Sequence, residues 1–264
     1  MIAIAGQGLH SAAYSTVRFS VRAGAVAFRV AGVETPIDEL EVADTARSSA
    51  VLLRDGRRLA TVEHLFAALG GLRIRSDIVI DVEGPEVPLV DGGAQRFAKE
   101  LIALGPTRSR PRLRVAREAT LAVGGSRYEF AISNETSVVV DVDFDHPKIE
   151  RHARWDGDSS DFVARIAPAR TFGFEHEVEE LLARGLASHV SPESVIVLGR
   201  DRVLSAGAPY EADEPARHKL LDLVGDMYLH GGPCVGIVRA SKPGHAATHE
   251  AMKQALAAGI LVRD

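Results

Sequence analysis

The sequence predicts an α+β protein whose chain folds in two layered halves. Its 264 residues allow one large domain or two small ones. Each half shows the same order of element types, namely strands, a helix, a strand and a helix, as in layered α+β folds. Between the halves, the stretch PTRSRPRLRV has the proline and arginine density of a linker. We therefore expect an N-terminal domain over 1–106 and a C-terminal domain over 107–264.

The first half begins with strand-like alternation of apolar and polar residues. This pattern runs over 16–30, with turn residues at Ala23-Gly24. The spacing then becomes helical, and Thr61 can cap the start of this helix while Gly70-Gly71 can end it. The remaining elements expected here are a strand that begins at Ser76 and leads into a Pro/Gly-rich loop, and a short helix that ends at Gly105.

The second half repeats this order of element types, although no residue-level repeat links the two halves. The expected elements are strands over 128–134 and 137–147, a helix from 159 that passes into a loop by 174, a helix over 175–187, strands over 193–199 and 201–207, a helix over 213–226, a strand over 234–241 and a helix over 249–260.

Composition and charge exclude several classes of protein. Hydrophobic residues make up 46% of the chain and charged residues 25%, the balance of a soluble globular protein. The formal net charge of −5 gives no general attraction to nucleic acid or to an anionic membrane. The single cysteine, Cys234, excludes an internal disulfide framework and a zinc site built mainly from thiolates. We see no signal peptide and no long apolar span, so we expect a reduced, cytoplasmic setting.

The stretch DEPARHKLLDLVGD places a histidine and two aspartates at four-residue spacing. His218, Asp222 and Asp226 therefore share one face of the predicted helix, beside its apolar positions. A solvated polar face is the simpler interpretation of such a row. A histidine and a carboxylate four residues apart can instead bind one metal ion together, with a third ligand from elsewhere.

The stretch TVEHLFAAL supplies a candidate for that third ligand. His64 lies in the first turn of the predicted helix, and the preceding Glu63 could then act as a general base. Alternatively, Glu63 is a charge that suits the helix N-terminus, and His64 is a hydrogen-bonded boundary residue.

Three further residues are candidates on weaker grounds. His245 follows a Pro-Gly turn and could be a general acid, or it could be an ordinary loop histidine. Thr171 lies in a predicted loop closed by Gly173, where its hydroxyl could stabilise an oxyanion or bond its own backbone. The stretch GQGLHS lacks the third glycine of a dinucleotide-binding turn, which leaves His10 as a candidate site residue.

Six motifs in this order resemble one enzyme family. They are GQGLHS, TVEHLFAAL, PEVPLVDGGA, ARTFGF, RHKLLDLVGDMYL and KPGHA, and they run from Gly6 to about Leu256. The chain resembles the UDP-3-O-acyl-N-acetylglucosamine deacetylases, zinc hydrolases of lipid A biosynthesis in Gram-negative bacteria. This resemblance implies two α+β domains, each a sheet with two helices. The helix layers would pack against each other, with the site between the domains.

The resemblance also implies a role for each matching residue. His64, His218 and Asp222 would bind Zn²⁺, although two imidazoles and a carboxylate also suit Fe²⁺. Glu63 would be the general base and His245 the general acid, with its charge supported by Asp226. The resemblance further assigns Thr171 and Lys219 to the oxyanion and nearby charge, and Phe172 and Lys242 to the sugar and the diphosphate. We expect His10, the candidate from the GQGLHS stretch, to bind substrate as well.

The function implied is removal of the N-acetyl group from UDP-3-O-acyl-N-acetylglucosamine by a cytoplasmic monomer. The implied partner is thus a UDP-linked acylated amino sugar, with no nucleic acid and at most peripheral membrane contact through the acyl chain. Two alternatives stay open: the same amidase chemistry on a different N-acyl sugar, and a non-catalytic paralogue that binds a nucleotide-sugar or lipid.

One segment departs from the family pattern. Ser188 and His189, followed by Pro192, stand where the family has a Gly-Gly segment within the substrate-side insert, here about 172–200. Side chains fill space that glycine leaves open, and proline stiffens the turn. We therefore expect a narrower acyl passage at unchanged catalytic chemistry.

Overall fold

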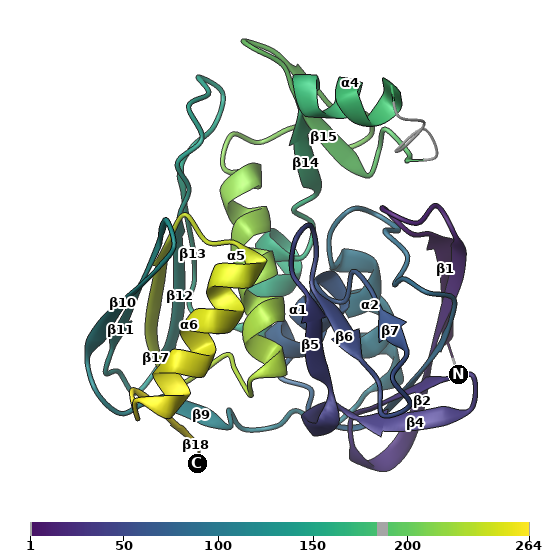
Figure 1. The fold of residues 1–264 in the computed structure, drawn as a ribbon, viewed down its shortest axis with the longest axis vertical. Helices are drawn as coiled ribbons and strands as arrows, with labels where there is room; N and C mark the ends of the chain where they lie inside the picture. The colour runs from purple at the N-terminus through teal and green to yellow at the C-terminus, as the bar shows by residue number, and fades with distance from the viewer. Residues whose placement is uncertain (1, 184–189, 264) are drawn as a thin grey trace.

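Two five-stranded sheets enclose the main helices, as Figure 1 shows. The computed structural model describes residues 2–183 and 190–263. The first sheet has the order β1-β2-β8-β3-β4, in which only β8 and β3 are parallel neighbours. Its strands are β1 (Ile2–Gln7), β2 (Tyr14–Ala25), β8 (Ser76–Glu83), β3 (Ala27–Val30) and β4 (Val33–Pro36).

The second sheet repeats this topology with residues of the second half. Its order is β10-β11-β17-β12-β13, and β17 and β12 are again the parallel pair, third and fourth across the sheet. Its strands are β10 (Ala119–Val123), β11 (Ser126–Ala131), β17 (Gly236–Ser241), β12 (Thr136–Asp141) and β13 (His152–Trp155). The similarity in element order seen in the sequence is thus a similarity of fold.

Four helices form two layers between the sheets (Figure 1). They are α1 (Glu63–Gly71) and α2 (Gln95–Leu104) of the first half, and α5 (Glu214–Leu229) and α6 (His245–Ala257) of the second. Helix α1 packs on the first sheet, where Phe66 meets Phe28 edge to face, and on α5 at its other side. Because α1 is covered from both sides, all nine of its residues are buried. The α+β architecture with facing helix layers is therefore confirmed.

A glycine sets the distance between α1 and α5. A Cβ atom at Gly225 would lie 2.1 Å from the backbone oxygen of Glu63, a separation that no side chain tolerates. The two backbones therefore meet closely at the start of α1 because α5 carries glycine there.

The remaining elements are short. They are the β5-β6-β7 sheet (Glu41–Asp44, Ala50–Leu52 and Arg58–Leu59), the β14-β15-β16 sheet (Thr171–Phe174, Val195–Leu198 and Val203–Leu204), α4 (Glu175–Ala183), the β9-β18 pair (Leu113–Val115 and Leu261–Arg263), a 3-10 turn at Ile37–Glu39, α3 (Ser159–Asp161) and a π-helical turn at Phe162–Ile166. In Figure 1, β14, β15 and α4 stand at one end of the layered body.

Several local expectations are wrong. Thr61 does not cap α1, because the N-cap residue is Val62; the Thr61 hydroxyl, one residue earlier, donates to Glu86 at 2.7 Å. Strand β2 continues through Gly24 to Ala25, so the break falls at Val26 rather than at Ala23-Gly24. Thr171 begins strand β14 rather than lying in a loop, because its segment pairs with β15.

Helix α6 begins at His245, four residues earlier than expected from the apolar spacing. The Pro-Gly turn ends at Gly244, which is the N-cap residue, so His245 is helical rather than a loop residue.

None of the helices among the described residues is long and apolar enough to span a membrane.

Candidate active site

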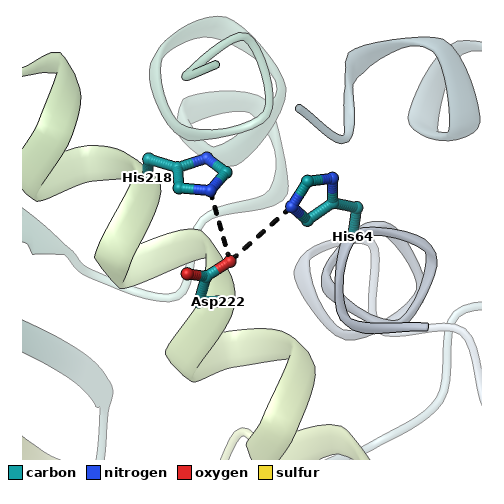
Figure 2. Close-up of side chains that lie close together, drawn as sticks. All are labelled: His64, His218 and Asp222. Atoms are coloured by element: carbon teal, nitrogen blue, oxygen red, sulfur yellow. Dashed lines mark ion pairs between the residues drawn. The ribbon is translucent and has the colours of Figure 1, made fainter. Parts of the chain in front are cut away.

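The close contact of α1 and α5 brings three ionisable side chains to one buried point, which Figure 2 shows. The Nε2 atoms of His64 and His218 lie 3.7 and 3.5 Å from Oδ1 of Asp222. The two imidazole rings meet edge to face, with their centroids 5.1 Å apart. Within residues 2–183 and 190–263, this group alone combines ligand atoms in a metal-binding arrangement, all within 4.8 Å of one another.

Neighbouring hydrogen bonds leave the free ligand atoms facing one another. Nδ1 of His218 lies 3.0 Å from the carbonyl oxygen of Ala169, which can only accept, so Nδ1 carries the proton and Nε2 is free. Oδ2 of Asp222 accepts from Lys219 Nζ at 2.8 Å. Oδ1 of Asp222 is buried and has no hydrogen-bond partner among the described residues. Such an oxygen is costly unless a cation satisfies it, so these residues fit a divalent metal.

Electrostatics keep these groups in the protonation states that bind a metal. Burial lowers the pKa of His64 to about 3, and the adjacent His218 adds to this effect. Burial also lowers the pKa of His218. At Asp222, burial alone would raise the pKa, but Lys219 and His218 outweigh it and hold the pKa well below its usual range. Neutral imidazoles and an ionised carboxylate are the ligand forms required.

Glu63 lies beside this group, at the start of α1. Its Oε2 accepts from the backbone N–H of Ser49 at 3.0 Å, and its Oε1 lies 3.8 Å from Nε2 of His245. Burial raises the pKa of Glu63 to about 8, although His245 opposes this rise. A carboxylate with so high a pKa can both take and return a proton near neutral pH.

His245 forms a buried ion pair with Asp226. Its Nδ1 donates to Oδ2 of Asp226 at 2.9 Å, which turns Nε2 toward Glu63. Burial alone would lower the pKa of His245, but Asp226 raises it to about 10. His245 therefore holds a proton that it can donate.

A cavity of about 1140 Å³ opens beside these groups. Thr171 and Phe172 of β14 line it, as does Lys219 of α5. The Phe172 ring centroid lies 6.1 Å from that of His218 and 5.8 Å from Lys219 Nζ. Arg170, next to Thr171, forms a buried ion pair with Glu214 at 2.8 Å, which ties the start of β14 to α5. The cavity therefore lies next to the group of His64, His218 and Asp222, through Phe172 and Lys219, although those three residues are not among the described residues that line it.

The other predicted substrate residues divide between two places. His10 lines the cavity, and its backbone N–H donates to Glu86 at 3.0 Å. Lys242 is not among the described residues that line it, and its ammonium pairs with Asp143 at the surface. Ser188 and His189 lie outside the described residues, whereas Pro192 lines the cavity.

Sequence reasoning missed three residues that belong to this region. Arg47 lines the cavity, Ser49 contacts both Glu63 and Asp226, and His249 lies 3.3 Å from Asp226. His249 follows His245 by four residues, so helical spacing could have found it. Arg47 and Ser49 lie in an irregular loop, where spacing gives no such signal.

A buried group that can hold a metal ion, beside a carboxylate and a protonated imidazole, is the arrangement of a hydrolytic enzyme. The model of the family LpxC, UDP-3-O-acyl N-acetylglycosamine deacetylase, matches residues 1–257. The chain therefore belongs to this deacetylase family.

Three relatives named UDP-3-O-acyl-N-acetylglucosamine deacetylase illustrate the match. The protein from Syntrophotalea carbinolica is 39% identical, over 85% of this chain and 74% of its own. Those from Shewanella piezotolerans and Haemophilus influenzae are 36% and 34% identical, each over 97% of this chain and 88% of their own.

Proposed function

We propose that this protein is a metal-dependent amidase that removes the N-acetyl group from UDP-3-O-acyl-N-acetylglucosamine in lipid A biosynthesis. The observation that carries the proposal is the buried group of His64, His218 and Asp222, with Glu63 and His245 beside it. Family membership supports the substrate class. The proposal includes a cytoplasmic monomer with domains over 1–106 and 107–264.

His64, His218 and Asp222 would hold the metal, for which we propose zinc, with ferrous iron as the alternative. When bound, such a cation polarises a carbonyl group and lowers the pKa of water. Support for this set comes from Oδ1 of Asp222, which has no hydrogen-bond partner in the part of the chain that the structure describes, and from the fixed tautomer of His218.

The residues around the metal group would move the protons. Glu63, in its ionised form, takes a proton from the attacking water. His245 gives its Nε2 proton to the departing amine, and Asp226 holds the imidazolium in place at 2.9 Å. Thr171 and Lys219 line the cavity next to these groups, where they stabilise negative charge on the carbonyl oxygen.

The cavity would hold the substrate beyond its acetamide. Val195 and Val197, which alternate along β15 with the buried Ile196 and Leu198, face the cavity and suit an acyl chain. Phe172 lies where a sugar ring can stack, and Lys242 at the surface would meet the diphosphate.

A deacetylation assay tests this function directly. The purified protein is loaded with Zn²⁺ and given UDP-3-O-acyl-N-acetylglucosamine, and release of acetate is measured. We expect turnover, and loss of turnover when a chelator removes the metal. Turnover only of N-acyl sugars without the UDP or 3-O-acyl groups would favour a different sugar substrate. Binding without turnover would favour a non-catalytic protein.

A further inference from the structure

A second pair of buried histidines lies behind Asp226, away from the metal group. Nε2 of His249 lies 2.9 Å from Oγ of Ser49 and 3.3 Å from Oδ1 of Asp226. Nδ1 of His249 lies 2.9 Å from Nε2 of His230. The exposed fractions of His249 and His230 are 3% and 9%. These contacts join the loop before β6, the end of α5 and the first turns of α6.

The donors and acceptors in this hydrogen-bonded network of side chains follow from the chemistry of each group. Asp226 is ionised, so both of its oxygens accept, and the Ser49 hydroxyl donates its only proton to Oδ1 at 2.5 Å. Nε2–H of His249 then points at two acceptors, Oγ of Ser49 at 2.9 Å and Oδ1 of Asp226 at 3.3 Å, which share it. Nδ1 of His249 lies against Nε2 of His230, so one of these two nitrogens donates to the other.

Three donors meet at one carboxylate. Oδ1 of Asp226 receives Ser49 and His249, while Oδ2 receives His245. Burial of His230 lowers its pKa to about 4, and His249 adds to this, so His230 is neutral near pH 7. Because two donors hold Oδ1, the Asp226 carboxylate cannot rotate freely. The orientation of Oδ2, which accepts from His245, is therefore fixed.

We propose that His249 is a positioning residue, which together with Ser49 and His230 orients Asp226 and thereby aims His245 at Glu63. This inference rests on the proposed function, because it needs His245 to act in the reaction. Ser49, His249 and His230 would thus support Asp226, which in turn supports His245, the proposed general acid.

Other ionisable groups also lie close to Asp226. Glu63 on α1 and Asp222 on α5 carry like charges, and Tyr128 on β11 is buried nearby and bonds Thr248 at 2.9 Å. None of these donates to Oδ1 of Asp226 in the described residues, whereas Ser49 and His249 do.

The test compares two substitutions of His249 with a neighbour on the same helix. His249→Leu removes both ring nitrogens, and His249→Gln keeps an N–H donor near the position of Nε2. Thr248→Val is the matched control, since Thr248 is equally buried on α6 but bonds Tyr128 rather than Asp226. Each zinc-loaded variant is assayed for kcat, KM, metal content and the dependence of rate on pH.

We expect His249→Leu to lower kcat by about tenfold, the lower end for loss of an outer partner of a site residue, with KM and metal content unchanged. His249→Gln should recover most of this loss, and Thr248→Val should resemble the unaltered protein. In His249→Leu the alkaline limb of the pH profile should move to higher pH. Asp226 then has one donor fewer and stabilises the imidazolium of His245 more strongly.

A double substitution separates this inference from the proposed function. In the Asp226→Asn background, His249→Leu should cost nothing further, because His249 acts through Asp226. An equal cost in both backgrounds, or an effect of His249→Leu no larger than that of Thr248→Val, would overturn the inference while Asp226 kept its role. An unchanged rate together with an unchanged pH profile in Asp226→Asn itself would overturn the proposed role of the His245 pair.

Ser49→Ala provides a second route if His249→Leu does not fold. It removes the hydroxyl that links His249 to Asp226 while changing little volume. We expect a lower kcat at unchanged metal content and KM. An unaltered kcat in this variant would overturn the inference as well.

Discussion

The metal-binding group and the cavity wall are built in different ways. His64, His218 and Asp222 are buried on two helices, α1 and α5, whose backbones meet at Gly225. The wall comes from the short strands β14, β15 and β16 and from α4, which stand at one end of the body (Figure 1). Buried groups on packed helices have fixed geometry, whereas a small sheet with an open side can change with little cost to the core.

From this contrast we infer that the reaction and the selectivity for the acyl chain depend on different parts of the molecule. Substitutions in the helix layers should abolish catalysis whatever the acyl chain, and substitutions in the wall should change which acyl chain is used.

Removal of one proposed metal ligand should have the largest effect. His218→Ala and Asp222→Ala should each lose most of the bound metal and nearly all activity, because two remaining side chains hold a divalent ion poorly. Metal per chain is measured by elemental analysis. His152→Ala is the control, since His152 also pairs with an aspartate but is exposed. Full metal occupancy in His218→Ala would exclude this site.

Loss of the carboxylate beside the metal group should come next. Glu63→Gln should keep the metal and the fold but lower kcat roughly a hundred-fold to ten-thousand-fold, the usual contribution of a general acid or base. Glu250→Gln, an exposed change on α6, serves as the control for loss of one negative charge. Near-normal turnover in Glu63→Gln would show that Glu63 has no catalytic role and acts only as a charge at a helix N-terminus.

The Asp226 partner should affect the pH dependence more than the maximal rate. Asp226 raises the pKa of His245 to about 10 against the effect of burial, so a neutral amide at this position lets that pKa fall. Activity that needs protonated His245 is then lost at lower pH. In Asp226→Asn the alkaline limb should therefore move to lower pH, measured as kcat/KM against pH. An unchanged limb would remove Asp226 from the mechanism.

A change in the wall should have the smallest and most selective effect. Val197→Phe narrows the cavity, so substrates with long acyl chains should lose kcat/KM relative to short ones. Each methylene that no longer fits costs about 0.8 kcal/mol, or about fourfold. A series of substrates that differ only in acyl length measures this, with Val21→Phe on the exposed part of β2 as control. An equal loss for all chain lengths would break the division between reaction and selectivity.

The same series tests the natural selectivity of this protein. Ser188 and His189 lie outside the described residues, so the narrower passage that they suggest stays a prediction. A preference for shorter acyl chains would support it, and a steady rise up to the longest chains would contradict it. The domain boundary at 106/107 likewise stays a prediction.

The sequence by itself determined the parts of the site that lie within one helix. His218, Asp222 and Asp226 share a face of α5 because the helical period fixes their spacing wherever the helix packs. Helix α2 and its end at Gly105 follow from local rules as well, because Gly105 takes the left-handed conformation that a helix end needs. The motif order gave the family, and with it the two-layer arrangement.

Only the tertiary structure decided which groups meet across elements. Glu63 reaches His245 because Gly225 lets α1 and α5 approach, and neither residue specifies that contact locally. Thr61 lies one residue before the N-cap of α1, and its hydroxyl donates to Glu86, which a distant segment supplies. Ser49 and His249 also come from segments far from Asp226 in the sequence, so only the packing of these segments brings them to it. Backbone geometry sets neighbours a few residues apart, whereas the partners of a buried polar group depend on every layer that removes it from water.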